Sequence, residues 1–172
     1  THQENRFNHF DRERILYKMN TEEGPAMVSA DLNGDKINDM FVGGAKGQSS
    51  SLFLSNGDNY IESTAPFGND ASSEVVEVLA FDSDNDGDLD LYIGHGGSVF
   101  SQYSNDLDDV IYINDGKGNF NKAIDAIQFP ERISTGGVAI ADYDEDGSVD
   151  IFVANRNSHL SYGTIGNGYL FH

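Results

Sequence analysis

The sequence predicts an all-β protein built from repeated units of four short antiparallel strands. Three observations support this prediction. An acidic segment of nine residues occurs three times, short apolar stretches flank each copy, and Gly-containing turns follow at matching places. Short stretches rich in β-branched and aromatic residues are typical of buried strands, whereas helices need about ten residues or more.

The acidic segments share the pattern D-x-[DN]-x-D-x-x-x-D, whose positions we number 1 to 9. The first acidic loop covers residues 31–39, the second 82–90 and the third 142–150. Because an apolar stretch precedes and follows each loop, we expect each loop to join two strands as a hairpin. The predicted strand pairs are 26–30 with 40–43, 75–81 with 91–94, and 137–141 with 151–154.

A third and a fourth strand complete each predicted unit. Residues 51–55 and 110–114 are the third strands, and Asn-Gly or Asp-Gly turns then lead to strands that begin at Tyr60 and Phe120. The last unit stops at its third strand, 169–171. Four short strands in each repeat of about 40–60 residues are the signature of a β-propeller blade.

The sequence therefore holds about two and a half blades, and we expect it to be a fragment of a larger propeller. The approximate blade limits are 25–70, 71–132 and 133–172. We interpret residues 1–24 as an edge segment of a preceding blade. Because open blade ends expose apolar faces, we expect the remaining blades of a parent chain, or self-association, to cover them.

Composition excludes several classes of function. The chain has 172 residues, with 29 Asp and Glu against 10 Lys and Arg, and a formal net charge of −19. Such an acidic surface disfavours nucleic acid as a partner. No apolar run is long enough to span a membrane. The absence of Cys excludes disulfides, thiolate metal sites and a Cys nucleophile.

The acidic loops are candidate calcium sites. Carboxylates at positions 1, 3, 5 and 9 of a tight loop can converge on one ion, and the carbonyl of position 7 would add a fifth donor. Calcium takes six to eight oxygen ligands, whereas magnesium keeps more water, and transition metals favour His or Cys. An EF-hand is excluded, because strands flank the loops and position 12 is apolar. We expect the first acidic loop, with Asn33, Lys36 and Ile37, to bind most weakly.

The loops and their flanking strands resemble FG-GAP/VCBS repeats, the calcium-loop blades of integrin-α-like β-propellers. The family pattern D-x-[DN]-x-D-G-x-x-D-[LIV] matches fully over 82–94, nearly fully over 142–154 and less well over 31–43. The resemblance implies up to three structural Ca²⁺ ions and an extracytoplasmic location. The ligands it implies are Asp31, Asn33, Asp35, Ile37 and Asp39; Asp82, Asp84, Asp86, Asp88 and Asp90; and Asp142, Asp144, Asp146, Ser148 and Asp150.

The connections from second to third strands are predicted to lie at the opposite end of the blades. They span 44–50, 95–109 and 155–168, and the two longer ones carry side chains that could face a ligand. These are Phe100, Tyr103, Arg156, His159 and Tyr162. Loops on a rigid scaffold are common binding sites. Packing between neighbouring blades explains the same side chains equally well.

The sequence therefore favours a calcium-stabilised module that binds a protein or carbohydrate ligand, or serves adhesion. It shows no catalytic constellation, and we predict no enzyme activity. Two alternatives stay open at this point. One is part of a lyase or hydrolase acting on polysaccharide, because abundant carboxylates could supply an acid–base pair. The other is a purely structural segment of a large secreted protein.

Overall fold

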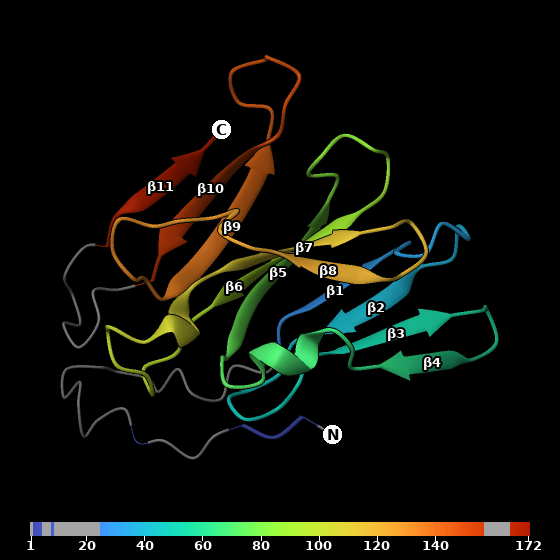
Figure 1. The fold of residues 1–172 in the computed structure, drawn as a ribbon, viewed down its shortest axis with the longest axis horizontal. Helices are drawn as coiled ribbons and strands as arrows, with labels where there is room; N and C mark the ends of the chain where they lie inside the picture. Colours follow the sequence, from blue (N-terminus) through green and yellow to red (C-terminus); the bar gives the residue numbers. More distant parts are fainter. Residues whose placement is uncertain (1, 5–7, 9–24, 157–165) are drawn as a thin grey trace.

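The computed structural model describes residues 2–4, 8, 25–156 and 166–172. These residues form eleven strands in three antiparallel sheets and no α-helix (Figure 1). Blade 1 contains β1 (Met27–Ala30), β2 (Asp39–Val42), β3 (Ser51–Ser55) and β4 (Tyr60–Ser63). Blade 2 contains β5 (Val75–Phe81), β6 (Asp90–His95), β7 (Val110–Asn114) and β8 (Phe120–Ala123). Blade 3 contains β9 (Thr135–Ala141), β10 (Asp150–Asn155) and β11 (Gly168–Phe171).

Each sheet is an up-and-down meander, in which every strand pairs with the next one along the chain. The all-β prediction is confirmed, and each predicted strand is present with ends that differ by at most two residues. Within the described segments, two short 3-10 helices, Phe67–Asp70 and Asn105–Leu107, lie in the connections. The predicted edge segment 1–24 falls almost wholly outside the described residues.

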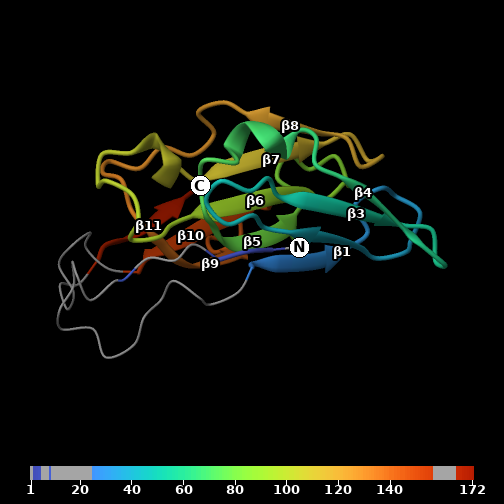
Figure 2. The same cartoon turned by 90° about the horizontal axis from the view of Figure 1, so that it is seen from below.

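The first strands of the three blades lie next to one another. β1 contacts β5, and β5 contacts β9, so that the blades fan out from a shared inner side (Figure 2). Two glycines allow this approach. A Cβ atom on Gly43 would lie 2.6 Å from Val75 Cγ1 of the next blade, and one on Gly94 would lie 2.8 Å from Thr135 Cγ2. A larger residue at either position would push the next blade away.

Blade 2 is covered on both faces. Its strand residues point alternately to either side, and each face packs into a core shared with a neighbouring blade. Leu91 and Ile93 of β6 pack into the core shared with blade 1, whereas Tyr92 packs into the core shared with blade 3. The free face of blade 3 is different. There Phe152 and Leu170 pair across β10 and β11 and stay 45% and 42% exposed.

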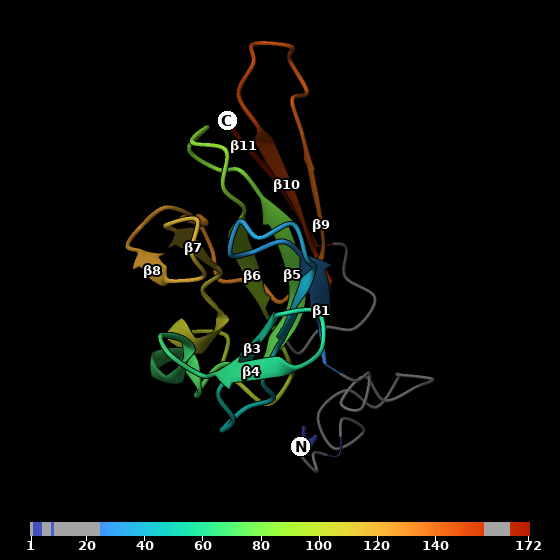
Figure 3. The ribbon, with the colours of Figure 1, turned by 90° about the vertical axis from the view of Figure 1, so that its right-hand side faces the viewer.

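The three acidic loops lie at the same end of the sheets, as Figure 3 shows. They connect β1 to β2, β5 to β6, and β9 to β10. The β2–β3 and β6–β7 connections lie at the opposite end. This arrangement places three similar acidic segments side by side on one rim of the molecule.

Candidate metal centre

The last aspartate of each acidic loop is buried at the start of a second strand. Asp39, Asp90 and Asp150 begin β2, β6 and β10 and are 0%, 1% and 4% exposed. The other acidic side chains of the loops are half-buried or exposed. Each loop therefore has one anchored end and a solvent-facing body.

Carboxylates inside each loop accept hydrogen bonds from the loop's own backbone. At position 1, Asp82 Oδ2 accepts from the Gly87 N–H (3.0 Å) and Asp142 Oδ2 from the Gly147 N–H (3.0 Å). Asp31 Oδ2 accepts in the same way from the Lys36 N–H, at 2.8 Å. These bonds give all three loops the same shape, in which the position-1 carboxylate accepts from the position-6 N–H of its own loop.

This shape requires left-handed backbone angles at positions 4 and 6. The residues are Gly34 and Lys36, Asn85 and Gly87, and Glu145 and Gly147, with φ between +62° and +93°. Glycine and asparagine adopt such angles readily, but lysine and glutamate do so at a cost of about 1–2 kcal/mol. The first and third acidic loops therefore each hold one residue in an unfavourable conformation.

Replacing Lys36, whose φ is +69°, with glycine is expected to raise the free energy of unfolding by about 1 kcal/mol. The backbone N–H that donates to Asp31 is kept in this variant. Urea unfolding in EGTA measures the change without a contribution from bound cation. Lys117→Gly is the matched control, because Lys117 is exposed and is not among the residues with positive φ. Equal effects of the two changes would contradict the backbone explanation.

The carboxylates converge closely enough to share a cation in two of the loops. In the second acidic loop, oxygens of Asp82, Asp84 and Asp90 all lie within 4.8 Å of one another. In the third, the same holds for Asp142, Asp144 and Asp146. Both sets contain oxygen donors alone, which is the chemistry that hard cations prefer.

The second acidic loop is electrostatically strained without a cation. Desolvation, followed by the charges of Asp86 and Asp90, raises the pKa of Asp84. Desolvation and the charges of Asp86, Asp82 and Asp115 likewise raise the pKa of Asp88. A divalent cation among these groups would remove the repulsion, so the loop fits such an ion.

A model of the FG-GAP-like repeat matches residues 31–93 and 99–153, which is more than half of the chain. The chain belongs to the FG-GAP-like repeat family. Each match begins in one blade and ends in the second strand of the next, so the FG-GAP sequence unit is offset from the sheets. A search of curated proteins found no match. Among the described residues, no helix is long and apolar enough to cross a membrane.

Several FG-GAP ligand positions do not join the converging groups. Within the described part of the chain, the carboxylates of the first acidic loop form no such group, and Asp86 and Asp150 lie outside the groups of their own loops. In the first loop position 3 is Asn33, which supplies an amide oxygen instead of a carboxylate. The carbonyl ligands expected from Ile37, Asp88 and Ser148 stay a prediction.

The position-9 aspartates have a second role that the FG-GAP pattern does not reveal. Asp90 Oδ2 accepts from the Ser83 N–H at 3.0 Å, and its Oδ1 accepts from the Asn114 N–H at 2.8 Å. Asp39 bonds in the same way to the N–H groups of Leu32 (2.9 Å) and Ser55 (2.7 Å). Each carboxylate thus ties its loop to the end of the third strand, independently of any metal.

One amide also connects two FG-GAP loops of neighbouring blades. The Asn114 Nδ2 group donates to the carbonyl of Leu32 at 2.9 Å and to that of Leu89 at 3.0 Å. Leu32 belongs to the first acidic loop and Leu89 to the second. The side chain is 5% exposed, so these bonds are shielded from water. Nothing in the spacing of the repeats identifies this link, because it joins residues 82 positions apart.

The predicted ligand-facing residues differ in their surroundings. Tyr103 is 77% exposed and Arg156 is exposed, as a ligand-binding face requires. The prediction for Phe100 is wrong, because its side chain is 3% exposed and its ring is covered by Lys46, whose Nζ lies 4.4 Å from the ring centroid. Phe100 therefore packs within the protein. His159 and Tyr162 lie outside the described residues.

Proposed function

We propose that this chain is a calcium-binding β-propeller module of an extracytoplasmic protein and that it serves ligand binding or adhesion. The convergence of three carboxylates within 4.8 Å in each of two acidic loops carries the proposal. FG-GAP membership supports it, because these repeats occur in ligand-binding and adhesion modules.

The donor set favours calcium over other cations. The two loops offer carboxylate oxygens and contain no His or Cys. Calcium accepts irregular sets of oxygen ligands, whereas magnesium demands a near-octahedral site and retains water. We assign the ions a structural role, because each loop connects two strands of a blade.

The location follows from the affinity expected of such loops. Exposed loops of this type suit the millimolar calcium found outside cells, and FG-GAP repeats are typical of extracellular proteins. The exposed pair Phe152 and Leu170 on the free face of blade 3 would then be covered by further blades or by a second copy.

Calcium is expected to raise the melting temperature of the chain, because the ion binds the folded state and not the unfolded one. At a free concentration of 100 times Kd, one site adds about 2.7 kcal/mol to the free energy of unfolding. Calorimetry in calcium, in magnesium and in EGTA measures the shift, and titration calorimetry gives the stoichiometry. A melting temperature that is the same in calcium and EGTA would refute the proposal.

Matched variants assign the shift to the loops. Asp84→Asn and Asp144→Asn each remove one carboxylate from a converging group and are expected to reduce the calcium-induced shift. Asp58→Asn makes the same chemical change in the β3–β4 turn, outside the loops, and should leave the shift unchanged. Equal effects of all three variants would indicate a general response to charge instead of bound ions.

A further inference from the structure

A polar pocket lies at the end of blade 2 that faces away from the acidic loops. Its volume is about 520 Å³, within the range of small-molecule sites. The end of β6, the 3-10 helix Asn105–Leu107, the end of β8 and the segment 124–132 between blades 2 and 3 form its walls. None of the acidic-loop residues lines it, so the pocket is separate from the candidate metal centre.

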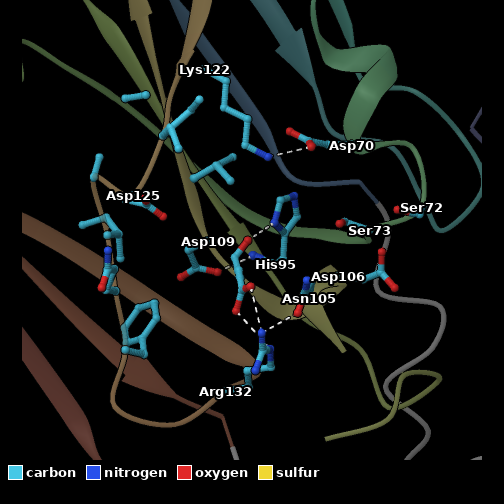
Figure 4. A pocket seen from close by; sticks show the side chains of 18 of the residues that line it. Asp70, Ser72, Ser73, His95, Asn105, Asp106, Asp109, Lys122, Asp125 and Arg132 are labelled. Atoms are coloured by element: carbon cyan, nitrogen blue, oxygen red, sulfur yellow. Dashed lines mark hydrogen bonds and ion pairs between the residues drawn. The ribbon is translucent and has the colours of Figure 1, made fainter. Parts of the chain in front are cut away.

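His95 is the central side chain of this pocket (Figure 4). It is 1% exposed, and its Nδ1 lies 2.7 Å from the carbonyl oxygen of Asp108. A carbonyl can only accept, so Nδ1 carries the proton and donates this bond. Burial lowers the pKa of His95, which keeps the ring neutral and leaves a lone pair on Nε2.

The Nε2 atom of His95 is buried, and no donor among the described residues reaches it. In Figure 4 the ring points toward the side of the pocket where Lys122 and Asp70 meet. A buried acceptor that lacks a donor destabilises the folded chain. His95 lines the pocket, so a ligand hydroxyl that displaces the side chains covering Nε2 would satisfy this acceptor.

The other polar groups of the pocket are held in place by ion pairs. Lys122 Nζ lies 2.7 Å from Asp70 Oδ1, and Arg132 Nε lies 3.3 Å from Asp108 Oδ1. Asp109 is fixed more deeply, because Tyr92, Thr135 and the His95 N–H all donate to it. The pocket is thus organised before any ligand arrives.

The charges of the lining select the class of ligand. Six acidic and two basic side chains line the pocket, so an anion would be repelled. An ammonium ligand would gain from the carboxylates but, as a donor only, could not use the N–H groups of Lys122 and Arg132. Among the described residues, the groups that converge enough for a metal ion lie in the acidic loops and not here. A neutral ligand with several hydroxyls can use both the donors and the acceptors.

We propose that this pocket binds one saccharide unit, whose hydroxyls donate to His95 Nε2 and to pocket carboxylates and accept from Lys122 and Arg132. Partly buried apolar side chains, Ile127 and Phe129, line the same pocket and would contact the C–H face of the ring. The proposal rests on the proposed role in ligand binding and names the ligand class. Phe100 is not among the residues that line this pocket.

The test is titration of the isotope-labelled chain, in calcium, with methyl glycosides of glucose, mannose, galactose and xylose and with N-acetylglucosamine. Binding is expected to shift the ¹⁵N resonance of His95 Nε2 and the backbone amides of Lys122 and Asp125. His95→Asn keeps a donor for the Asp108 carbonyl but removes the Nε2 acceptor. It should weaken binding about tenfold or more.

Asp125→Asn is a second pocket variant, which tests the proposal even where His95→Asn fails to fold. Asp125 is exposed at the edge of the pocket, and its φ of +59° suits asparagine well, so this variant should fold. It is expected to weaken saccharide binding, whereas Asp58→Asn in blade 1 should not. Saccharide binding that survives both pocket variants would overturn the proposal.

Two further probes separate the possible outcomes. Ethanolamine tests an ammonium ligand, and inorganic phosphate tests an anion. Shifts at His95 with either probe, and with none of the sugars, would overturn the saccharide assignment. So would the absence of any shift across the panel. A chain that binds sugar but shows no calcium-dependent stability would refute the proposed calcium-binding function and leave the pocket assignment standing.

Discussion

Replacing Asp90 with alanine is expected to lower the free energy of unfolding by about 3 kcal/mol or more, in calcium and in EGTA alike. The carboxylate is 1% exposed and accepts from the N–H groups of Ser83 and Asn114, and also from the Ser83 hydroxyl. Its removal leaves buried donors without partners. Urea unfolding in both buffers measures the loss.

Asp84→Ala is the matched control for this variant. Asp84 belongs to the same converging group but is exposed, and its raised pKa shows that its charge is unfavourable in the absence of a cation. We expect Asp84→Ala to destabilise the chain in calcium and to leave it unchanged or slightly more stable in EGTA. If Asp90→Ala behaves like Asp84→Ala in EGTA, then the position-9 carboxylate acts through the ion alone.

Replacing Phe67 with alanine is expected to lower the free energy of unfolding by about 3–5 kcal/mol. Phe67 lies in the 3-10 helix between blades 1 and 2 and is 2% exposed. Its ring contacts Phe41 of blade 1 at 5.0 Å between centroids, and Tyr112 and Phe120 of blade 2 at 4.9 Å and 5.8 Å. The substitution therefore creates a cavity between two blades.

Urea unfolding of Phe67→Ala measures this loss, and Tyr60→Ala provides the control. Tyr60 is also aromatic but is 60% exposed in β4, so its removal should change stability by less than about 0.5 kcal/mol. Phe67→Leu should lie between the two. A small effect of Phe67→Ala would mean that blades 1 and 2 pack without help from the connecting segment.

The repeated unit could be predicted from the sequence because its signals are local. The aspartate spacing identifies the hairpins, and the apolar stretches identify the strands on either side. Residues 75–81, for example, form β5 with the predicted ends.

Features that depend on distant residues could not be predicted in this way. Phe100 was expected to face a ligand, but only the folded chain brings the Lys46 side chain over its ring. The burial of His95 and the bonds of Asp109 likewise depend on segments that are far apart in the sequence. The positive φ of Lys36 and Glu145 could have been inferred, because they occupy the loop positions of Gly87 and Asn85.

The Asn114 side chain has a consequence for the order of ion loading. The amide of Asn114 donates to carbonyl groups of both the first and the second acidic loop. An ion that orders one loop therefore also restricts the motion of the other. If calcium binds as proposed, occupation of the carboxylate-rich second loop lowers the entropy lost when the first is filled. Reciprocal linkage of this kind produces positive cooperativity. The chain would then respond to rising calcium more steeply than a set of independent loops.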